Sequence, residues 1–373
     1  MNGPIRSSCL FLLLQLVIQS YGLSSPASSS GTASKHVAAA VLVPGYLTGA
    51  DELKSLQASL TKQGLPTVTV PMPNWHWLSV MGGRSVRPIL ERIDFTVQHL
   101  IARLAEDEEE EHGKNFPNFQ YSLLDAWTDF QDNPGGVAEV GGSSLPSEYP
   151  KDIAPRGNFP FPDLVLPPKK KIALIGHSAG GWISRIYLSD QEYGGKVYNG
   201  SNYVHSLVTL GTPHASAPGP AFAGISWINE QEESAQEQLQ QQKQQQLQYA
   251  DSSGKTRTLA VAGKGYSGDQ WGGMTKGSYS FCSPDGSDGS KYDGDGMTPI
   301  FSSLAMPNSE SLVLPQDRVN HFGWTDVGWV GKQVAPELYE DMETNGSLWY
   351  GSDEVVAEWL PWILEGVTTT TKK

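Results

Sequence analysis

The stretch that decides the fold is Lys169–Asp190, which reads KKKIALIGHSAGGWISRIYLSD. The apolar run Ile172–Ile175 predicts a buried strand, and the apolar spacing that follows predicts a helix. Between them lies a G-x-S-x-G pattern centred on Ser178. A sharp strand-to-helix turn strains such a serine, and the flanking Gly176 and Gly180 remove side chains that would clash. The stretch predicts a nucleophile at the carboxyl end of a strand; the simpler interpretation is a tight turn that contains a serine.

Strands and helices alternate along most of the chain. Apolar runs predict strands within residues 37–43, 66–71, 171–176, 204–214, 257–266 and 310–315, and helical spacing predicts helices within 51–64, 87–104, 180–190 and 353–364. In the first helix, Asp51 is expected to be the N-cap and Gly64 to end the helix. Because such alternation produces a parallel sheet with helices on both faces, the sequence predicts an α/β fold.

Composition is that of a globular protein. The chain has 373 residues, of which 38% are hydrophobic and 18% charged, enough for a well-buried core. The formal net charge of −14 at pH 7 argues against binding to nucleic acid, because phosphates need a basic surface. We interpret this charge as one that favours solubility.

The N-terminus has the pattern of a targeting segment. The apolar block Cys9–Ile18 is short for a membrane span, so residues 1–23 are expected to be a signal peptide. Residues 24–35 are rich in Ser and Ala and predict a linker or a transit-like segment. The protein is thus expected to enter the secretory pathway, to the endoplasmic reticulum or the exterior; the alternative is a plastid reached by a bipartite signal. Signal removal would leave Cys282 without an internal disulfide partner, which favours an internal compartment.

One large domain is expected at residues 36–365, followed by a polar tail at 366–373. Two inserts, at about 105–168 and 218–255, interrupt the alternation of strands and helices. The first opens with an acidic run, which predicts a solvated helix end or a disordered insert. The second contains a Gln-rich tract, which predicts a low-complexity loop, although its position also suits a mobile lid.

A serine hydroxyl is a weak nucleophile unless a base accepts its proton. On a sheet of this kind the usual chain order is serine, then an acid, then histidine. His321 follows the last predicted strand and is the expected base, whereas His205 lies at the wrong end of a strand and His214 precedes every suitable acid. The expected acid is Asp295, which lies between two glycines, with Asp293 as the fallback. Its carboxylate would hold the imidazole in the correct tautomer.

Two backbone N–H groups are needed to bind the oxyanion of an acyl-transfer reaction. One is expected from Ala179, directly after the serine, and the other from Tyr46 in the turn after the first strand, with Leu47 as the alternative. The side chains predicted to line a pocket are Leu47, Trp75, Trp77, His177 and His214. For the two tryptophans, packing under the inserts is an alternative that we favour.

Five segments in this order, VLVPGY, GHSAGG, LGTPH, DGDGMTP and VNH, resemble the lipase-like α/β-hydrolases. The similarity is closest to a plant, cyanobacterial and algal branch, which NWHWL, GGRSVRPILERID and LWYGSDEVVAEWL also resemble, and more distant to the inositol deacylases of GPI anchors. It covers most of residues 37–364 and implies an α/β-hydrolase fold with a mostly parallel central sheet and two low-complexity or cap-like insertions. It also implies Ser178, Asp295 and His321 as the triad of an acyl-ester hydrolase. The inserts depart from the family, so the substrate class transfers poorly.

The predicted function is that of a serine esterase or lipase-type acyl hydrolase acting on an ester or lipid through an acyl-enzyme. This mechanism requires no metal or organic cofactor. A calcium site is not expected in the Gly- and Asp-rich loop at 285–295, because the loop lacks the EF-hand spacing and its closing Glu. An acyltransferase with the same triad is one alternative. A non-catalytic binding protein is another, which predicts a missing triad member, and none is missing. After signal removal no transmembrane segment is expected, peripheral membrane contact fits a lipid substrate, and no oligomeric state is predicted.

Overall fold

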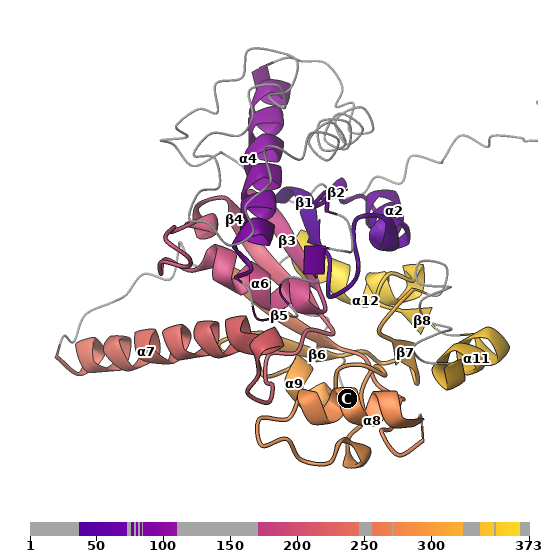
Figure 1. The fold of residues 1–373 in the computed structure, drawn as a ribbon. Helices are drawn as coiled ribbons and strands as arrows, with labels where there is room; N and C mark the ends of the chain where they lie inside the picture. Colours follow the sequence, from indigo (N-terminus) through magenta and orange to yellow (C-terminus); the bar gives the residue numbers. More distant parts are fainter. Residues whose placement is uncertain are drawn as a thin grey trace, which may run out of the picture. The chain divides into compact units, whose positions relative to one another are not determined.

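The computed structural model describes residues 37–72, 76–77, 80, 83, 85–109, 171–245, 256–270, 272–323, 336–346 and 348–365, all within one compact unit. Its centre is a six-stranded sheet in the order β2-β1-β3-β4-β5-β6, in which every neighbouring pair is parallel (Figure 1). The strands are β1 (Val37–Val43), β2 (Thr67–Thr69), β3 (Lys171–His177), β4 (Val204–Leu210), β5 (Arg257–Ala262) and β6 (Glu310–Val313). The predicted parallel sheet is confirmed.

Central strands are apolar along most of their length because both faces of the sheet are covered. Successive side chains of a strand point to opposite faces. In β1, Val41 and Val43 belong to the hydrophobic core on one face, and Leu42 belongs to the core on the other. This double burial explains the continuous apolar runs of the sequence.

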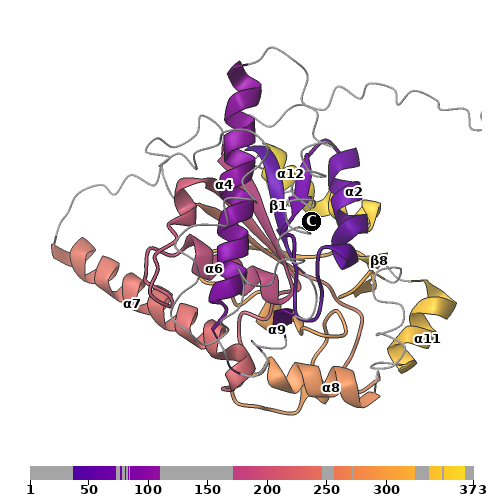
Figure 2. The same ribbon diagram turned by 45° about the horizontal axis from the view of Figure 1, so that its top comes forward.

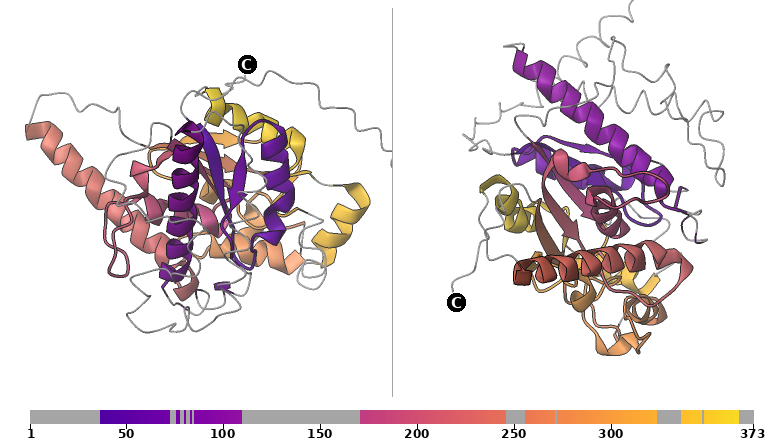
Figure 3. Two further views of the ribbon diagram at one scale, coloured as in Figure 1. Left: turned by 90° about the horizontal axis from the view of Figure 1, so that it is seen from above. Right: turned by 90° about the vertical axis from the view of Figure 1, so that its left-hand side faces the viewer.

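Helices cover both faces of the sheet, as Figures 2 and 3 show. On one face lie α4 (Arg87–Glu109), α6 (Ala179–Leu188) and the beginning of α7 (Ala223–Gln245). On the other face lie α2 (Lys54–Lys62) and α12 (Asp353–Glu365). The apolar side chains that predicted the helix at 87–104 are all buried in α4: Ile89, Ile93, Val97, Leu100 and Leu104.

The helix predicted at residues 51–64 begins differently from the expectation. A 3-10 turn, η1 (Asp51–Leu53), precedes α2, and Asp51 is not its N-cap. Asp51 instead forms an ion pair with Lys54 at 2.6 Å, while the Glu52 carboxylate accepts the N–H of Gly49 at 2.8 Å. The longer Glu52 side chain therefore reaches a backbone donor before the turn. Gly64, with φ +95°, follows the helix end as predicted, since glycine adopts this conformation without strain.

The Gln-rich tract is helical as far as Gln245, where the described residues end, and this corrects the prediction of a low-complexity loop. Its Gln, Glu, Ala and Leu residues all have good helix propensity. The beginning of α7 is anchored in the core by the buried Ile225 and Ile228, and Gly224 lies against the ring of Trp182 in α6. The rest of α7 extends away from the sheet (Figure 1).

Elements beyond the predicted ones complete the carboxyl-terminal part. They are α8 (Gly272–Phe281), α9 (Ile300–Ser303), α11 (Pro336–Asn345), β7 (Val319–Asn320) and β8 (Leu348–Trp349). The last two pair in parallel as a separate two-stranded sheet. None of the helices in the described ranges combines the length and the apolar composition that a membrane span requires.

Some predictions concern residues outside the described ranges. These are the signal peptide at 1–23, the segment at 24–35, most of the insert at 105–168, the tail at 366–373 and the pocket candidate Trp75.

Candidate active site

Ser178 lies at the sharp turn between β3 and α6 in a strained backbone conformation. Its φ is 53° and its ψ is −129°, a combination that residues other than glycine rarely adopt. Neighbouring glycines make this turn possible. A Cβ atom on Gly176 would lie 2.4 Å from the Cα of Gly181, and one on Gly180 would lie 2.2 Å from the carbonyl oxygen of Val43. The turn has the geometry of a nucleophile elbow.

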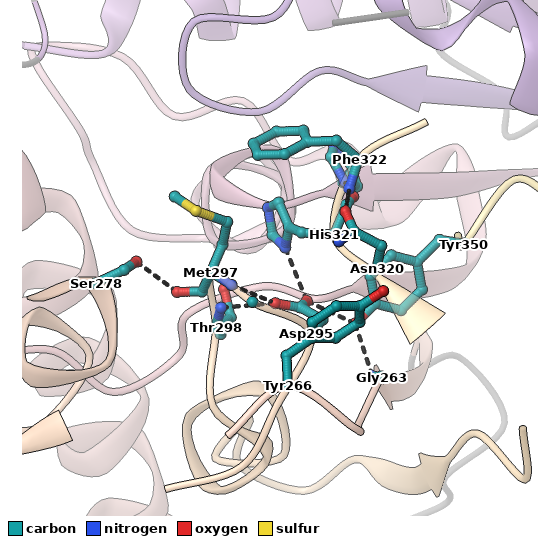
Figure 4. Close-up of polar contacts among 12 residues, drawn as sticks. Gly263, Tyr266, Ser278, Asp295, Met297, Thr298, Asn320, His321, Phe322 and Tyr350 are labelled. Carbon is teal, nitrogen blue, oxygen red and sulfur yellow. Dashed lines mark hydrogen bonds and ion pairs between the residues drawn. The ribbon is translucent and has the colours of Figure 1, made fainter. Parts of the chain in front are cut away.

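Asp295 and His321 form a buried hydrogen-bonded pair (Figure 4). Nδ1 of His321 lies 2.8 Å from Oδ2 of Asp295, and the His321 N–H donates to the Asp295 carbonyl oxygen at 2.9 Å. The N–H groups of Met297 and Thr298 donate to Oδ1 at 2.9 and 2.7 Å. A proton on Nδ1 leaves the lone pair of the neutral ring on Nε2, where a general base needs it.

Asp293, the fallback acid, makes a different set of contacts. Its Oδ1 accepts the N–H of Gly265 at 3.0 Å and that of Gly294 at 2.9 Å. These bonds tie its loop to the segment that follows β5. The structure therefore brings Asp295, and not Asp293, to the histidine.

His177 connects the elbow to the segment that carries His321. Its Nε2–H donates to the carbonyl oxygen of His321 at 2.8 Å, and the two ring centroids are 4.8 Å apart. Because His177 precedes Ser178, this contact brings the serine and the base to one edge of the sheet. In the part of the chain that the structure describes, no hydrogen bond joins Ser178 to His321; such bonds often tighten only when substrate is present. His177 is wholly buried, and burial, together with the neighbouring His321, lowers its pKa to about 3.

Ala179, the first predicted oxyanion donor, opens α6 directly after the serine. N–H groups in the first turn of a helix have no intrahelical acceptor and lie at the positive end of the helix dipole. The N–H of Ser178 donates to Leu210 at 2.9 Å, and that of Gly181 donates to Ser178 at 3.0 Å. The N–H of Ala179 has no such partner among the described residues.

The second predicted donor lies in a turn that packs on the serine. The N–H of Thr48 closes this turn on the carbonyl oxygen of Gly45 at 3.1 Å. A Cβ atom on Gly45 would lie only 2.4 Å from the Cβ of Ser178, so the turn and the elbow are in direct contact. Tyr46 is the second residue of the turn, and Leu47, with a left-handed φ of 57°, is the third. The N–H groups of Tyr46 and Leu47 therefore both belong to a turn that lies next to Ser178.

Trp77 packs against this turn and supports it. Its side chain is fully buried, and its Nε1–H donates to the carbonyl oxygen of Thr48 at 2.9 Å. Its ring meets the Tyr46 ring edge-on at 4.8 Å, and the Tyr46 hydroxyl donates to the carbonyl oxygen of Ala221. These contacts favour the packing alternative for Trp77 over a place in the pocket wall.

His214 belongs to a buried polar network between α6 and α7. Arg185 of α6 donates to Nδ1 of His214 at 3.2 Å and to Oδ1 of Asn229 at 2.8 Å, and it pairs with Glu232 at 3.0 Å. Nε2–H of His214 donates to the hydroxyl of Thr209 at 3.0 Å. Burial and the charge of Arg185 hold the pKa of His214 well below its usual value. Both ring nitrogens are engaged, so the side chain serves the docking of α7 on α6.

Tyr350 is a residue of this site that the sequence analysis missed. Its hydroxyl donates to Oδ2 of Asp295 at 2.8 Å and accepts the N–H of Gly263 at 2.7 Å. Tyr350 directly follows β8 and lies in the segment LWYGSDEVVAEWL, for which the sequence analysis noted a resemblance but no site residue. The pairing of β7 with β8 places Tyr350 beside His321. Strands of two residues are too short to be recognised in the sequence, so this pairing could not be predicted.

Metal ligands do not gather in the described ranges: no group of three or more His, Cys, Asp or Glu side chains there could hold an ion. The described residues offer a strained serine and a histidine–carboxylate pair, which His177 links to each other through its contact with His321.

Comparison with known proteins gives one match. Residues 164–268 match the model of a family described as the PGAP1-like alpha/beta domain. This segment includes Ser178 but neither Asp295 nor His321. No curated protein and no solved structure matches the chain significantly. The match supports the superfamily-level resemblance, while the plant and cyanobacterial branch stays a prediction. Over the matched segment the chain is similar to PGAP1-like α/β domains, a likeness that suggests a hydrolase of the lipase or esterase kind.

Proposed function

We propose that the protein is a serine hydrolase that cleaves carboxylic esters, with Ser178 as nucleophile, His321 as base and Asp295 as the acid that orients it. The observation that carries the proposal is the buried Asp295–His321 hydrogen bond of 2.8 Å, which His177 links to the strained elbow serine. Backbone strain of this kind is costly and gathers at functional sites. A histidine oriented by a carboxylate is the group that activates a serine hydroxyl.

The proposed reaction has two halves. The Ser178 hydroxyl attacks the ester carbonyl while Nε2 of His321 accepts its proton, and the same proton then passes to the leaving alcohol. Water hydrolyses the acyl-enzyme by the same route. The N–H of Ala179, with that of Tyr46 or Leu47, binds the oxyanion in both halves. Asp295 stabilises the imidazolium, and these steps need no metal ion or organic cofactor.

A lipid ester is the proposed substrate. Its support is a set of apolar side chains around the turn that packs on the serine. Leu47 is 45% exposed and Phe281 is 62% exposed. The ring centroid of Phe281 lies 6.4 Å from that of Phe222, which in turn lies 6.1 Å from that of Tyr46. Exposed apolar side chains that gather in this way favour peripheral contact with a membrane surface.

A substrate panel tests this choice. Galactolipid, phospholipid and triacylglycerol in vesicles or emulsions are compared with short p-nitrophenyl esters in solution. A lipid substrate predicts a higher kcat/KM on one of the lipids than on the short esters, and preference for the short esters in every case would contradict it. Analysis of the products with an alcohol acceptor present separates hydrolysis from acyl transfer.

Entry into the secretory pathway stays part of the proposal, with a plastid as the alternative. Its support is the apolar block Cys9–Ile18 near the amino terminus. Sequencing the amino terminus of the mature protein, together with its subcellular location, distinguishes the two.

The proposed nucleophile is tested by Ser178→Ala. We expect kcat on p-nitrophenyl butyrate to fall by about 10³-fold or more, because the attacking oxygen is gone. A fluorophosphonate probe should label the wild type at Ser178 and leave the variant unlabelled. The control is Ser184→Ala, on the same helix, where a buried hydroxyl donates to the carbonyl oxygen of Gly180 at 2.6 Å. Full activity in Ser178→Ala, or labelling at another residue, would refute the mechanism.

A further inference from the structure

Tyr350 lies fully buried against the carboxylate of the proposed acid. Its hydroxyl donates to Oδ2 of Asp295 at 2.8 Å, the same oxygen that receives the hydrogen bond from His321, as Figure 4 shows. The hydroxyl also accepts the N–H of Gly263 at 2.7 Å. That second bond orients the phenol, because the proton of the hydroxyl is then left to point at the carboxylate.

With Tyr350 in place, the carboxylate of Asp295 receives four hydrogen bonds. Oδ1 accepts two from backbone N–H groups of its own loop, those of Met297 and Thr298, and Oδ2 accepts two from the side chains of His321 and Tyr350. The loop therefore fixes one oxygen, and Tyr350 is the side chain besides the base that fixes the other.

Two glycines that follow β4 and β5 leave space for the contact between Tyr350 and Asp295. A Cβ atom on Gly211, after β4, would lie 2.5 Å from Oδ2 of Asp295 and 2.8 Å from the ring of Tyr350. A Cβ atom on Gly263, after β5, would lie 3.0 Å from the Cβ of Asp295 and 3.1 Å from the Tyr350 hydroxyl. Any side chain at Gly211 would displace the carboxylate or the phenol, so the site is shaped for both.

Chain topology brings Tyr350 and the base to the carboxylate together. In the two-stranded sheet, Asn320 of β7 is paired with Trp349 of β8. The next residues along the two strands are His321 and Tyr350. Their ring centroids lie 6.4 Å apart in an edge-on arrangement. The small sheet thus delivers a base and a phenol side by side to one carboxylate.

We propose that Tyr350 is a positioning residue of the reaction, which holds Asp295 in the orientation that aims His321 at the serine. This inference rests on the proposed function. Tyr350 touches neither the substrate nor the serine and acts through the carboxylate. Burial and the nearby Asp295 raise the pKa of Tyr350 well above its usual value, so the hydroxyl stays a donor at every pH at which the enzyme would work.

The test is Tyr350→Phe, which removes the hydroxyl and keeps the ring. Without the second donor on Oδ2, the carboxylate can turn, and we expect kcat for p-nitrophenyl butyrate to fall about tenfold with KM unchanged. Oδ2 of Asp295 then has His321 as its remaining partner among the described residues and stabilises the imidazolium more strongly. The acid limb of the kcat/KM profile should therefore move to higher pH, by about half a unit.

A matched control is Tyr279→Phe. The Tyr279 hydroxyl is also buried, accepts the N–H of Gly296 at 2.9 Å and donates to the carbonyl oxygen of Tyr266 at 2.6 Å. It thus holds the same loop without a hydrogen bond to the carboxylate. This variant should lose thermal stability much as Tyr350→Phe does and keep the wild-type pH profile. If the buried hydroxyl of Tyr350 has a structural role alone, the two variants should change alike.

The rate at which a fluorophosphonate labels Ser178, measured against pH, gives the same comparison without a known substrate. A slower rate with a shifted acid limb in Tyr350→Phe alone supports the proposal. Wild-type kcat and pH profile in folded Tyr350→Phe, or equal changes in the two tyrosine variants, overturn it. If Ser178→Ala itself keeps full activity, the proposed function fails first, so the two failures are distinguishable.

Discussion

Two aspartates separated by one residue make unrelated contacts. We therefore expect the same substitution at each to have different effects on kcat. Asp295 binds the imidazole of His321, whereas Asp293 binds backbone N–H groups. In Asp295→Asn the amide favours the wrong tautomer of the ring, so we expect kcat to fall by roughly 10³- to 10⁴-fold. In Asp293→Asn an amide oxygen can still accept the backbone N–H groups, and kcat should stay within about threefold.

Steady-state kinetics on p-nitrophenyl butyrate, with thermal melting of both variants, measures this difference. Loss of activity in folded Asp293→Asn with activity retained in Asp295→Asn would assign the acid to the other residue.

At the same scale, the sequence predicts the residues that have a local pattern. Ser178 is marked by its flanking glycines, and chain order leads from it to Asp295 and His321. Tyr350 has no such mark, because its contact with Asp295 joins residues 55 positions apart. For Trp77 the sequence indicates an aromatic residue near the site but not its role. The structure shows that its indole donates a hydrogen bond to the turn that packs on Ser178.

Among the elements, strands were easier to predict than the later helices. A parallel strand covered on both faces must be apolar along its length, and this makes it visible in the sequence. The four-residue α9 and the Gly- and Ser-rich α8 have no extended apolar stripe. For α7 the composition led to the wrong prediction of a loop. The tract has low complexity, but its residues also have high helix propensity.

Docking of α7 on α6 should depend on Arg185. Its guanidinium is almost fully buried and binds His214, Asn229 and Glu232. Arg185→Met fills a similar volume but leaves those polar groups without their donor, so we expect the free energy of unfolding to fall by about 3 kcal/mol. Hydrogen exchange in the first turns of α7 should become faster, because this network holds the helix to the core.

The control for that variant is Lys276→Met, which breaks an exposed pair with Asp288 at 3.1 Å. Exposed pairs contribute about 1 kcal/mol or less, so this variant should unfold close to the wild type. Equal stabilities of the two variants in urea would show that α7 is held by its apolar contacts alone.

For the molecule as a whole, two buried histidines lie where separate segments of the chain meet. His177 lies between the elbow and the base, and His214 lies between α6 and α7. In both, burial is the largest cause of a lowered pKa. A protonated ring at either position would place a charge in a buried site, and beside the Arg185 cation in the case of His214. Acid should therefore weaken the fold at the site and at the α6–α7 contact together.

The sign of this effect follows from where the protons bind. The pKa of His177 is about 3 in the folded protein and near 6.5 when the chain is unfolded. Between these values the unfolded chain binds a proton that the folded protein does not, so stability present above pH 6.5 is lost as the pH falls. In this range His177 contributes a slope of up to about 1.4 kcal/mol per pH unit. We therefore expect the wild type to lose about 1.2 kcal/mol between pH 6 and pH 5 from His177, with a further loss in the same direction from His214.

His177→Gln tests this expectation, because the amide Nε2 can replace the ring Nε2–H as a donor to the carbonyl oxygen of His321 and does not titrate. Urea unfolding at pH 7, 6 and 5 should show a slope lower by about 1.4 kcal/mol per pH unit than that of the wild type. His214→Gln should change the slope in the same direction, and the effects should add in the double variant, since the two residues have no shared partner in the described structure. An unchanged slope in His177→Gln would mean that this ring also gains a proton in the folded protein, and it would contradict the expectation.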